Sequence, residues 1–132
     1  MKRLGAFYRE KILSLPKKEL VKREMPYRSL ENMEIVRDLF GVKIYYTILG
    51  RKSRAFIECR SEEEARFLRI FNDAGMSEIY VPRDDDYLKS ILPELEKLKE
   101  RTDEIINSNL EYVLSRSMRE RLRREVYNEL MK

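Results

Sequence analysis

The chain has 132 residues, the size of one domain with one modest core. It contains no histidine and a single cysteine, Cys59, while charged residues make up 39% of it. These absences exclude a histidine-assisted nucleophile, an imidazole general base, a thiolate zinc cluster, an internal disulfide and a two-cysteine redox motif. We therefore expect no catalytic residues, no metal and no cofactor, and an enzymatic function is disfavoured.

The composition also indicates a habitat and a compartment. Glutamine is absent and Lys, Arg and Glu are abundant, which is typical of proteins from hyperthermophiles. No apolar run reaches the roughly 18 residues of a membrane span, and the first residues lack the pattern of a secretion signal. A soluble, cytoplasmic protein of a thermophile, with no contact to membranes, is expected.

Charge is spread unevenly along the chain. Residues 1–28 hold nine Lys or Arg and three acids, residues 84–115 hold four and nine, and residues 116–132 hold six and three. Basic ends with an acidic stretch between them allow two interpretations. The ends could bind a polyanion, or the N-terminal helices could pack against the acidic stretch.

Three helices are predicted at the N-terminal end. The first, residues 2–14, is basic with apolar residues on one face. The second would span residues 17–25. The third would span residues 29–40, with Ser29 as its N-cap and Gly41 after its last turn.

The middle of the chain changes to a strand pattern. Val42–Leu49 and Arg54–Arg60 are rich in β-branched and aromatic residues and predict an antiparallel hairpin around a polar turn. Ser61 with Glu64 forms a capping box that opens a helix. Glu78–Val81 predicts a third strand, which would pair in parallel with the second through the helical crossover.

The last third predicts one very long amphipathic helical region. We expect Ser90 to cap it just before Pro93, and a kink or break near 107–109 or near a second capping box at Ser117. Apolar residues fall three and four apart, with Thr102 and Asn109 filling the remaining positions of a heptad seam. The apolar seam residues are Leu88, Ile91, Leu95, Leu98, Ile105 and Tyr112. Since this seam has no obvious cover in the chain, it predicts a homodimer.

Together these elements predict a single α+β domain over residues 1–132. Residues 1–41 would be helical, residues 42–83 would form a ββαβ unit with a small three-stranded sheet, and residues 84–132 would form the helical, coiled-coil dimerisation segment.

The basic turn of the predicted hairpin, with Arg51, Lys52 and Arg54, is the leading candidate for a binding site. Three helices followed by a hairpin with a charged tip resemble the element order of winged-helix DNA-binding domains. The helix over residues 29–40 departs from that pattern, since it carries Glu31, Glu34 and Asp38 where phosphates would lie. The candidate nucleic-acid-binding residues are Arg51, Lys52, Arg54, Lys2, Arg3, Arg9, Lys17 and Lys18.

We therefore expect a non-catalytic protein that associates with nucleic acid as a dimer, with regulation as the suggested role. The alternative is a protein-interaction or assembly module that works through its long C-terminal helix. A remote alternative is a metal-dependent nuclease, because Asp84–Asp86 follow a strand end and Glu58-x-Arg60 is an acid-x-basic element. Capping of a helix is the favoured role for the three aspartates.

Overall fold

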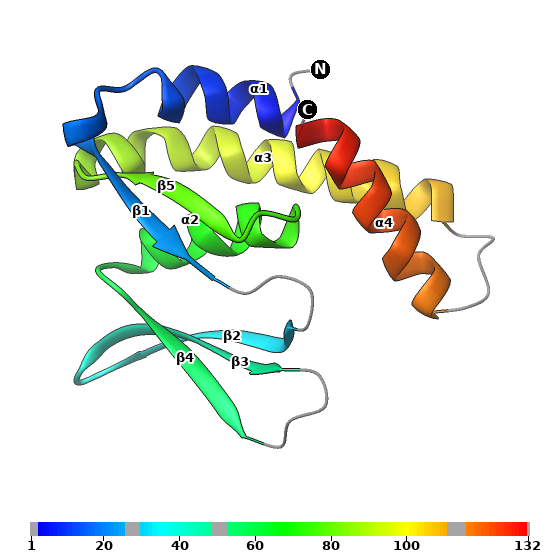
Figure 1. Ribbon diagram of the computed structural model, residues 1–132, viewed down its shortest axis with the longest axis horizontal. Helices are drawn as coiled ribbons and strands as arrows, with labels where there is room; N and C mark the ends of the chain where they lie inside the picture. Colours follow the sequence, from blue (N-terminus) through cyan, green and yellow to red (C-terminus); the bar gives the residue numbers. More distant parts are fainter. Residues whose placement is uncertain (1–2, 26–29, 49–52, 111–115, 132) are drawn as a thin grey trace.

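A computed structural model describes residues 3–25, 30–48, 53–110 and 116–131, and its architecture is α+β as predicted (Figure 1). The elements are α1 (Leu4–Tyr8), the π-helical turn η1 (Arg9–Leu13), the 3-10 turn η2 (Lys17–Glu19), β1 (Leu20–Glu24), β2 (Leu30–Asp38), β3 (Gly41–Ile48), β4 (Arg54–Cys59), α2 (Glu62–Asp73), β5 (Glu78–Pro82), α3 (Asp85–Leu110) and α4 (Arg116–Met131).

Helix α2 lies at the centre of the fold. It packs against the inner face of a sheet of order β2-β3-β4, and its other sides contact β5 and α3 (Figure 1). Its buried Phe67, Leu68 and Phe71 join side chains of α1, β5 and α3 in one core. Burial of these large apolar side chains is the main favourable term for the fold. A second sheet pairs β1 with β5.

Several local predictions are confirmed. β3 and β4 form the predicted antiparallel hairpin. Ser61 is the N-cap of α2, and its hydroxyl accepts a hydrogen bond from the Glu64 backbone N–H at 3.1 Å. Asp84 precedes α3, and its carboxylate accepts from the N–H groups of Asp86 and Tyr87. In each case a polar side chain satisfies a first-turn N–H that the helix leaves unpaired.

The predicted second helix, residues 17–25, is wrong. Only the turn Lys17–Glu19 is helical, and Leu20–Glu24 forms β1. β1 pairs antiparallel with β5, from Leu20 opposite Pro82 to Glu24 opposite Glu78. The same pairing corrects the predicted parallel partner of β5. A strand more than 50 residues away in the chain decides this segment, and a short window of sequence does not contain that partner.

The predicted third helix is also wrong, because Leu30–Asp38 is strand β2. It pairs antiparallel with β3, so it extends the hairpin to a three-stranded sheet. Such a sheet is more stable than an isolated hairpin. Gly41 has φ of 119°, and a positive φ suits a hairpin turn as well as a helix end, so this glycine did not distinguish the two. With a strand here, the winged-helix element order is lost.

Helix α3 begins earlier than predicted. It starts at Asp85, so Ser90 is not its cap and Pro93 lies inside it. A proline inside a helix costs about 3 kcal/mol. Burial of Leu88, Ile91 and Leu95 on both sides of Pro93 offsets that cost. α3 ends at Leu110 and α4 starts at Arg116, so the last third of the chain forms two helices, and residues 111–115 between them lie outside the described residues.

Candidate interaction surface

The outer face of the three-stranded sheet is the surface that faces away from α2. Side chains alternate across a strand, so Val42, Ile44 and Cys59 point to α2 and are buried. Their neighbours point outward and form what we call the outer sheet face. Its members are Glu34, Val36, Asp38, Lys43, Tyr45, Arg54, Phe56 and Glu58. Among them Phe56 is 50% exposed, although phenylalanine is mostly an interior residue.

The turn between β2 and β3 carries two fully presented apolar side chains, and we call Leu39 and Phe40 the hairpin tip. Asp38 pairs with Gly41, so these two residues form the whole loop. The Phe40 N–H donates to the Asp38 carboxylate at 2.7 Å, which fixes the turn. Leu39 is 99% exposed and Phe40 is 87% exposed. Two-residue hairpin loops normally carry Asn and Gly, and local turn geometry does not require apolar side chains there.

Cations on the outer sheet face lie over aromatic rings. The Lys43 ammonium lies 5.0 Å from the Phe56 ring centre and 5.8 Å from that of Phe40. The Arg54 guanidinium lies 4.8 Å from the Tyr45 ring centre, and the Tyr45 and Phe56 rings are 5.6 Å apart. These contacts join the tip, β3 and β4 in one aromatic patch.

Both cations of this patch are already paired with acids. Lys43 lies 4.0 Å from the Asp38 carboxylate, and Arg54 bonds Glu34 at 2.9 Å. Glu58 adds a further carboxylate to the same face, and it forms no ion pair with any residue that the structure describes. The outer sheet face is therefore amphipathic, with its positive charge compensated.

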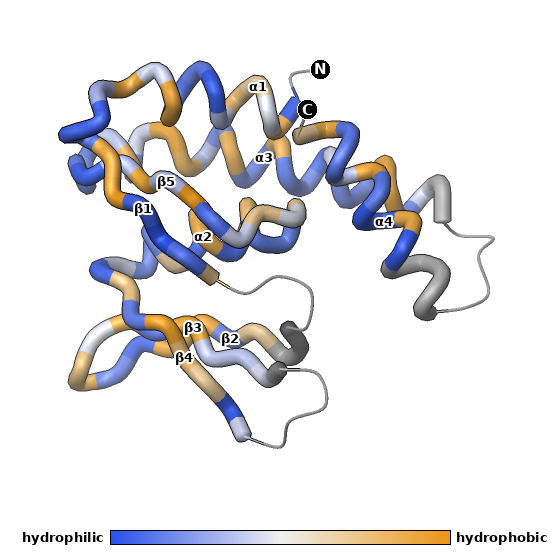
Figure 2. Tube along the Cα trace, viewed as in Figure 1, coloured by the Kyte–Doolittle hydropathy of each residue, from blue (hydrophilic) through white to orange (hydrophobic). Residues whose placement is uncertain are grey.

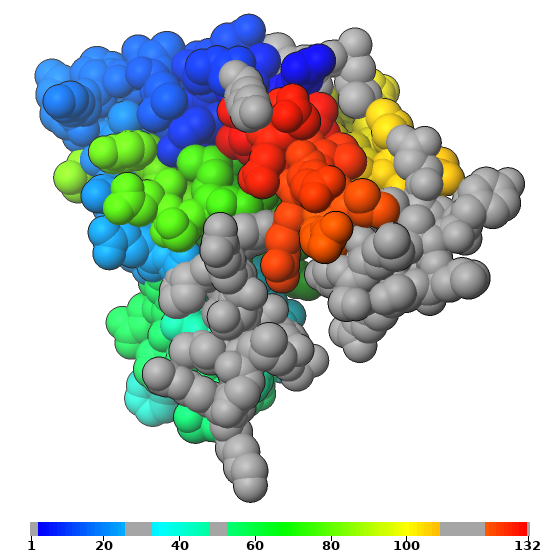
Figure 3. Space-filling model, turned by 45° about the vertical axis from the view of Figure 1, so that its right-hand side comes forward, coloured from blue at the N-terminus to red at the C-terminus, as the bar shows by residue number. Residues whose placement is uncertain are grey.

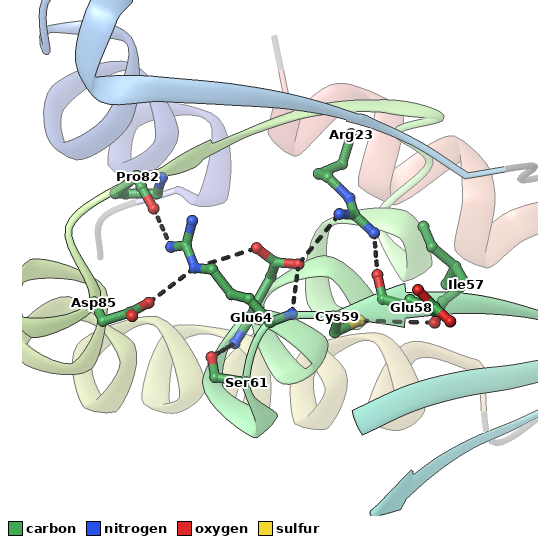
Figure 4. A network of polar contacts seen from close by, with 9 residues as sticks. Arg23, Ile57, Glu58, Cys59, Ser61, Glu64, Pro82 and Asp85 are labelled. Carbon is green, nitrogen blue, oxygen red and sulfur yellow. Dashed lines mark hydrogen bonds and ion pairs between the residues drawn. The ribbon is translucent and has the colours of Figure 1, made fainter. Parts of the chain in front are cut away.

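A cleft of about 490 Å³ lies between β1 and β4. It is lined by Arg23, Glu24, Met25, Tyr46, Phe56, Ile57 and Glu58. Arg23 reaches across from β1 and donates to the Glu58 backbone carbonyl (Figure 4). The same guanidinium lies 3.6 Å from the carboxylate of Glu64, which is only 1% exposed.

Glu64 is the centre of a polar network at the start of α2. Its second cation is Arg60, at 3.4 Å, and Arg60 also bonds Asp85 at 2.8 Å and the Pro82 carbonyl (Figure 4). A buried carboxylate is costly unless it is paired, and here two guanidinium groups pair it. The network ties β1, β4, α2 and α3 together, so its role is structural.

The candidate nucleic-acid residues that the structure describes lie in separate parts of the fold. Lys17 and Lys18 are exposed in η2, while Arg54 is at the start of β4, at the opposite end of the molecule (Figure 1). Arg3 precedes α1 and Arg9 follows it. Lys2, Arg51 and Lys52 lie outside the described residues. Nucleic-acid binding stays a prediction, without the shared surface on which it was based.

The predicted dimer seam is largely covered inside the chain. Leu88, Leu95 and Leu98 are buried, and so are Ile91 and Thr102. These residues therefore need no second copy of the chain to cover them. Beyond Thr102 the buried positions also differ from those that the heptad pattern predicts.

Beyond Thr102 the buried position is Ile106, at 1% exposure, while Ile105 is 47% exposed. A straight α-helix advances by 3.6 residues per turn and drifts from a 3.5-residue heptad, so the buried face moves by one position. The side chain of Asn109 and all of Tyr112 lie outside what the structure describes.

Helix α4 is anchored by a polar cluster that sequence reasoning missed. Tyr127, 1% exposed, donates to the Asp103 carboxylate of α3. Arg123 bonds Asp103 at 3.0 Å and Asp73 at 2.8 Å, and Lys99 bonds both acids at 2.7 Å. Lys99 and Arg123 also lie over the Tyr127 ring. Asp103 of the acidic stretch thus forms an ion pair with Arg123 of the C-terminal helix.

The charges of this cluster stabilise one another. Burial alone would raise the pKa of Asp103, but hydrogen bonds from Lys99 and Tyr127 outweigh it and lower the pKa. Burial would lower the pKa of Lys99, and Asp73 and Asp103 raise it instead. Val126 of α4 is 37% exposed, while Tyr127 one position later is the buried anchor.

The aspartates that were candidates for a metal site take part in contacts that stabilise the fold. Asp84 caps α3 and Asp85 pairs with Arg60, as described above. Among residues 3–25, 30–48, 53–110 and 116–131, no three His, Cys, Asp or Glu side chains gather as metal ligands would. Burial raises the pKa of the Cys59 thiol to about 11, which makes it a weak nucleophile.

Comparisons with known proteins add no assignment. Neither the protein-family models, nor the curated proteins, nor the solved structures give a match to this chain. Within the described part of the chain, no helix is both long enough and apolar enough to span a bilayer.

Proposed function

We propose that this chain is a protein-interaction module whose working surface is the outer sheet face together with the hairpin tip. The observation that carries the proposal is the exposure of Leu39 and Phe40, at 99% and 87%, in a fixed two-residue turn. Two large apolar side chains held in water suit insertion into an apolar pocket of a partner, as interface anchors do.

Its neighbours support the same surface. Figure 2 places this apolar turn at the end of the β2–β3 hairpin, away from the helices. Phe56 and Tyr45 continue the apolar area along the sheet, and Lys43 and Arg54 border it. An apolar centre with aromatic residues and a charged rim is the usual anatomy of a protein interface.

A protein partner fits this face better than nucleic acid does. Phosphate binding draws on cations that release counterions, and Lys43 and Arg54 are each paired with an acid of the same sheet. Glu58 adds negative charge beside them. Polyanion binding at the other end, around Lys17 and Lys18, is a separate hypothesis.

The test compares partner binding by the native chain and by Leu39→Ser/Phe40→Ser. Both chains are immobilised and exposed to a lysate of the source organism, and retained proteins are identified by quantitative mass spectrometry. Truncating an interface anchor costs about 2 kcal/mol or more, so the tip variant should lose specific partners by at least roughly tenfold. Its thermal stability should stay close to native, since the tip is outside the core.

Leu13→Ser is the matched control, because Leu13 is an exposed leucine (46%) in η1, at the other side of the fold. It should retain the same partners as the native chain. If all three chains retain the same proteins in equal amounts, the hairpin tip is not the working surface. Partners that nuclease treatment removes would indicate nucleic acid in place of protein.

A further inference from the structure

β4 is an edge strand whose free backbone groups can be identified. It is the last strand in the order β2-β3-β4, so one side of it has no strand partner among the residues that the structure describes. The Glu58 carbonyl accepts from Arg23 and therefore points away from β3. Backbone groups alternate in direction along a strand, so the N–H and C=O groups of Arg54 and Phe56 point to the same free side.

The side chains at these three positions share the outer sheet face, and their order is self-complementary. In an antiparallel pair of two β4 strands centred on Phe56, Phe56 lies opposite its own copy. Arg54 of one chain then lies opposite Glu58 of the other, and the reverse pair forms on the other side. Opposite charges and aromatic pairs at facing positions stabilise antiparallel strands. A twofold axis makes such an interface isologous.

The two edges of this sheet differ in how they resist pairing. The β2 edge has a register irregularity between Glu31 and Glu34, and such irregularities blunt an edge. β4 pairs with β3 over six consecutive residues without interruption, from Arg54 to Cys59. Its edge therefore stays regular, and its two charged residues attract a second copy instead of repelling it.

We propose that two copies of this chain associate by pairing β4 with β4 around Phe56, which joins their sheets into one. The cleft of about 490 Å³ beside β4 provides open space along this edge. Arg23 reaches Glu58 from the side of α2, since it also pairs with Glu64, and a carbonyl oxygen has a second lone pair to offer. Arg54 has five N–H donors, so it can keep Glu34 and bind Glu58 of the second copy.

This inference does not depend on the proposed function. The occupant is a second copy of the chain, and the inference is carried by Arg54, Phe56 and Glu58 at the β4 edge of the outer sheet face, whereas the partner-binding test changes Leu39 and Phe40. A tip variant should still dimerise, so loss of partners with dimerisation retained distinguishes the two proposals.

The experiment uses two charge variants, Arg54→Glu and Glu58→Arg, measured alone and mixed by sedimentation velocity. In the first variant alone, facing positions carry two acids, and in the second they carry two bases. Each should dissociate at least roughly tenfold more readily than the native chain, because two attractive pairs become repulsive. In a one-to-one mixture both facing pairs are attractive again, so the heterodimer should form with about native affinity.

A cross-linking experiment fixes the register. In a Cys59→Ala background, Phe56→Cys should form a covalent dimer under mild oxidation, because facing residues of a hydrogen-bonded pair lie about 5.5 Å apart, within disulfide range. Glu34→Cys, on the β2 side of the same face, should stay monomeric.

A native chain that stays monomeric at about millimolar concentration, beyond the range of even weak interfaces, would overturn the proposal. So would a mixture of the two charge variants that associates no better than either alone.

Discussion

At the scale of single residues, the hairpin tip depends on a small set of local interactions. Asp38 holds the turn through the Phe40 N–H, and Gly41 adopts the positive φ that the turn requires. Leu39 and Phe40 lie in this turn outside the core, at 99% and 87% exposure. Neither the core nor the turn requires apolar side chains at these two positions, so their apolar character points to a role in binding.

Gly5 is a residue whose role depends on a distant part of the chain, the end of α4. It lies in α1, where glycine lowers helix stability by about 1 kcal/mol relative to alanine. A Cβ at this position would lie 2.7 Å from the Met131 carbonyl oxygen and 2.8 Å from that of Leu130. The end of α4 packs directly on this helix, and the two helices lie together near the chain ends (Figure 3).

Replacing Gly5 by alanine should therefore destabilise the protein, although alanine is the better helix former. The clash is with backbone atoms, so α4 must shift, and such overpacking costs about 1–3 kcal/mol. Urea unfolding of native and Gly5→Ala chains measures the difference. In a chain that lacks residues 130–132 the same substitution should be neutral or stabilising, and an equal loss in both backgrounds would show that the contact with α4 is not the cause.

At the scale of elements, α3 is a core helix with an exposed opposite face. Its buried positions follow a period near 3.6 and pass from Thr102 to Ile106, and it packs on α1, α2 and α4. The amphipathic pattern predicted the helix itself. Its apolar residues at three- and four-residue intervals fit a coiled coil and a globular core equally well up to Leu98.

Helix α4 is held by charge as well as by packing. Because the pKa of Asp103 is lowered in the folded protein, its contribution to stability is present above its unfolded pKa, about 3.9, and is lost as the pH falls through the folded value. Asp103→Asn should be less stable than the native chain at pH 7, by about 1.5–3 kcal/mol for lost hydrogen bonds to charged groups.

As the pH falls through the lowered, folded pKa of Asp103, the native carboxylate is protonated too, so the difference should shrink toward zero. Urea unfolding of both chains at neutral and acidic pH measures this convergence. Glu104→Gln is the control, because Glu104 is exposed on the same helix, and its stability difference should be small at either pH. A deficit in Asp103→Asn that is equal at both pH values would exclude its charge as the source.

Strands β1 and β2 mark the limit of prediction from local patterns. The Ser61 cap of α2, the β3–β4 hairpin and the amphipathic pattern of α3 were readable because their determinants lie within a few residues. β1 and β2 each have a pattern compatible with a short helix, and their pairing partners β5 and β3 decide the outcome. The candidate surface depends on β2, so the wrong assignment of residues 29–40 also hid the hairpin tip.

At the scale of the whole molecule, charged residues mainly join elements. Arg23 and Arg60 pair with Glu64, and Arg123 and Lys99 pair with Asp103 and Asp73. The uneven charge along the sequence had two interpretations, and these contacts place part of it in internal ion pairs. Two sequence signals suggested a binding surface, the basic turn and the long seam. The basic turn is described only at Arg54, which pairs with Glu34, and most of the described seam residues are buried.

The central proposal is that the chain associates through its three-stranded sheet. Sedimentation velocity of Phe56→Asp and Ile105→Asp tests it most directly, because both residues are about half exposed, at 50% and 47%, and one lies on the sheet while the other lies on α3. A charge buried without a partner in an interface is costly. We expect Ile105→Asp to associate like the native chain and Phe56→Asp to be monomeric; the reverse outcome, with association lost only in Ile105→Asp, would contradict the account.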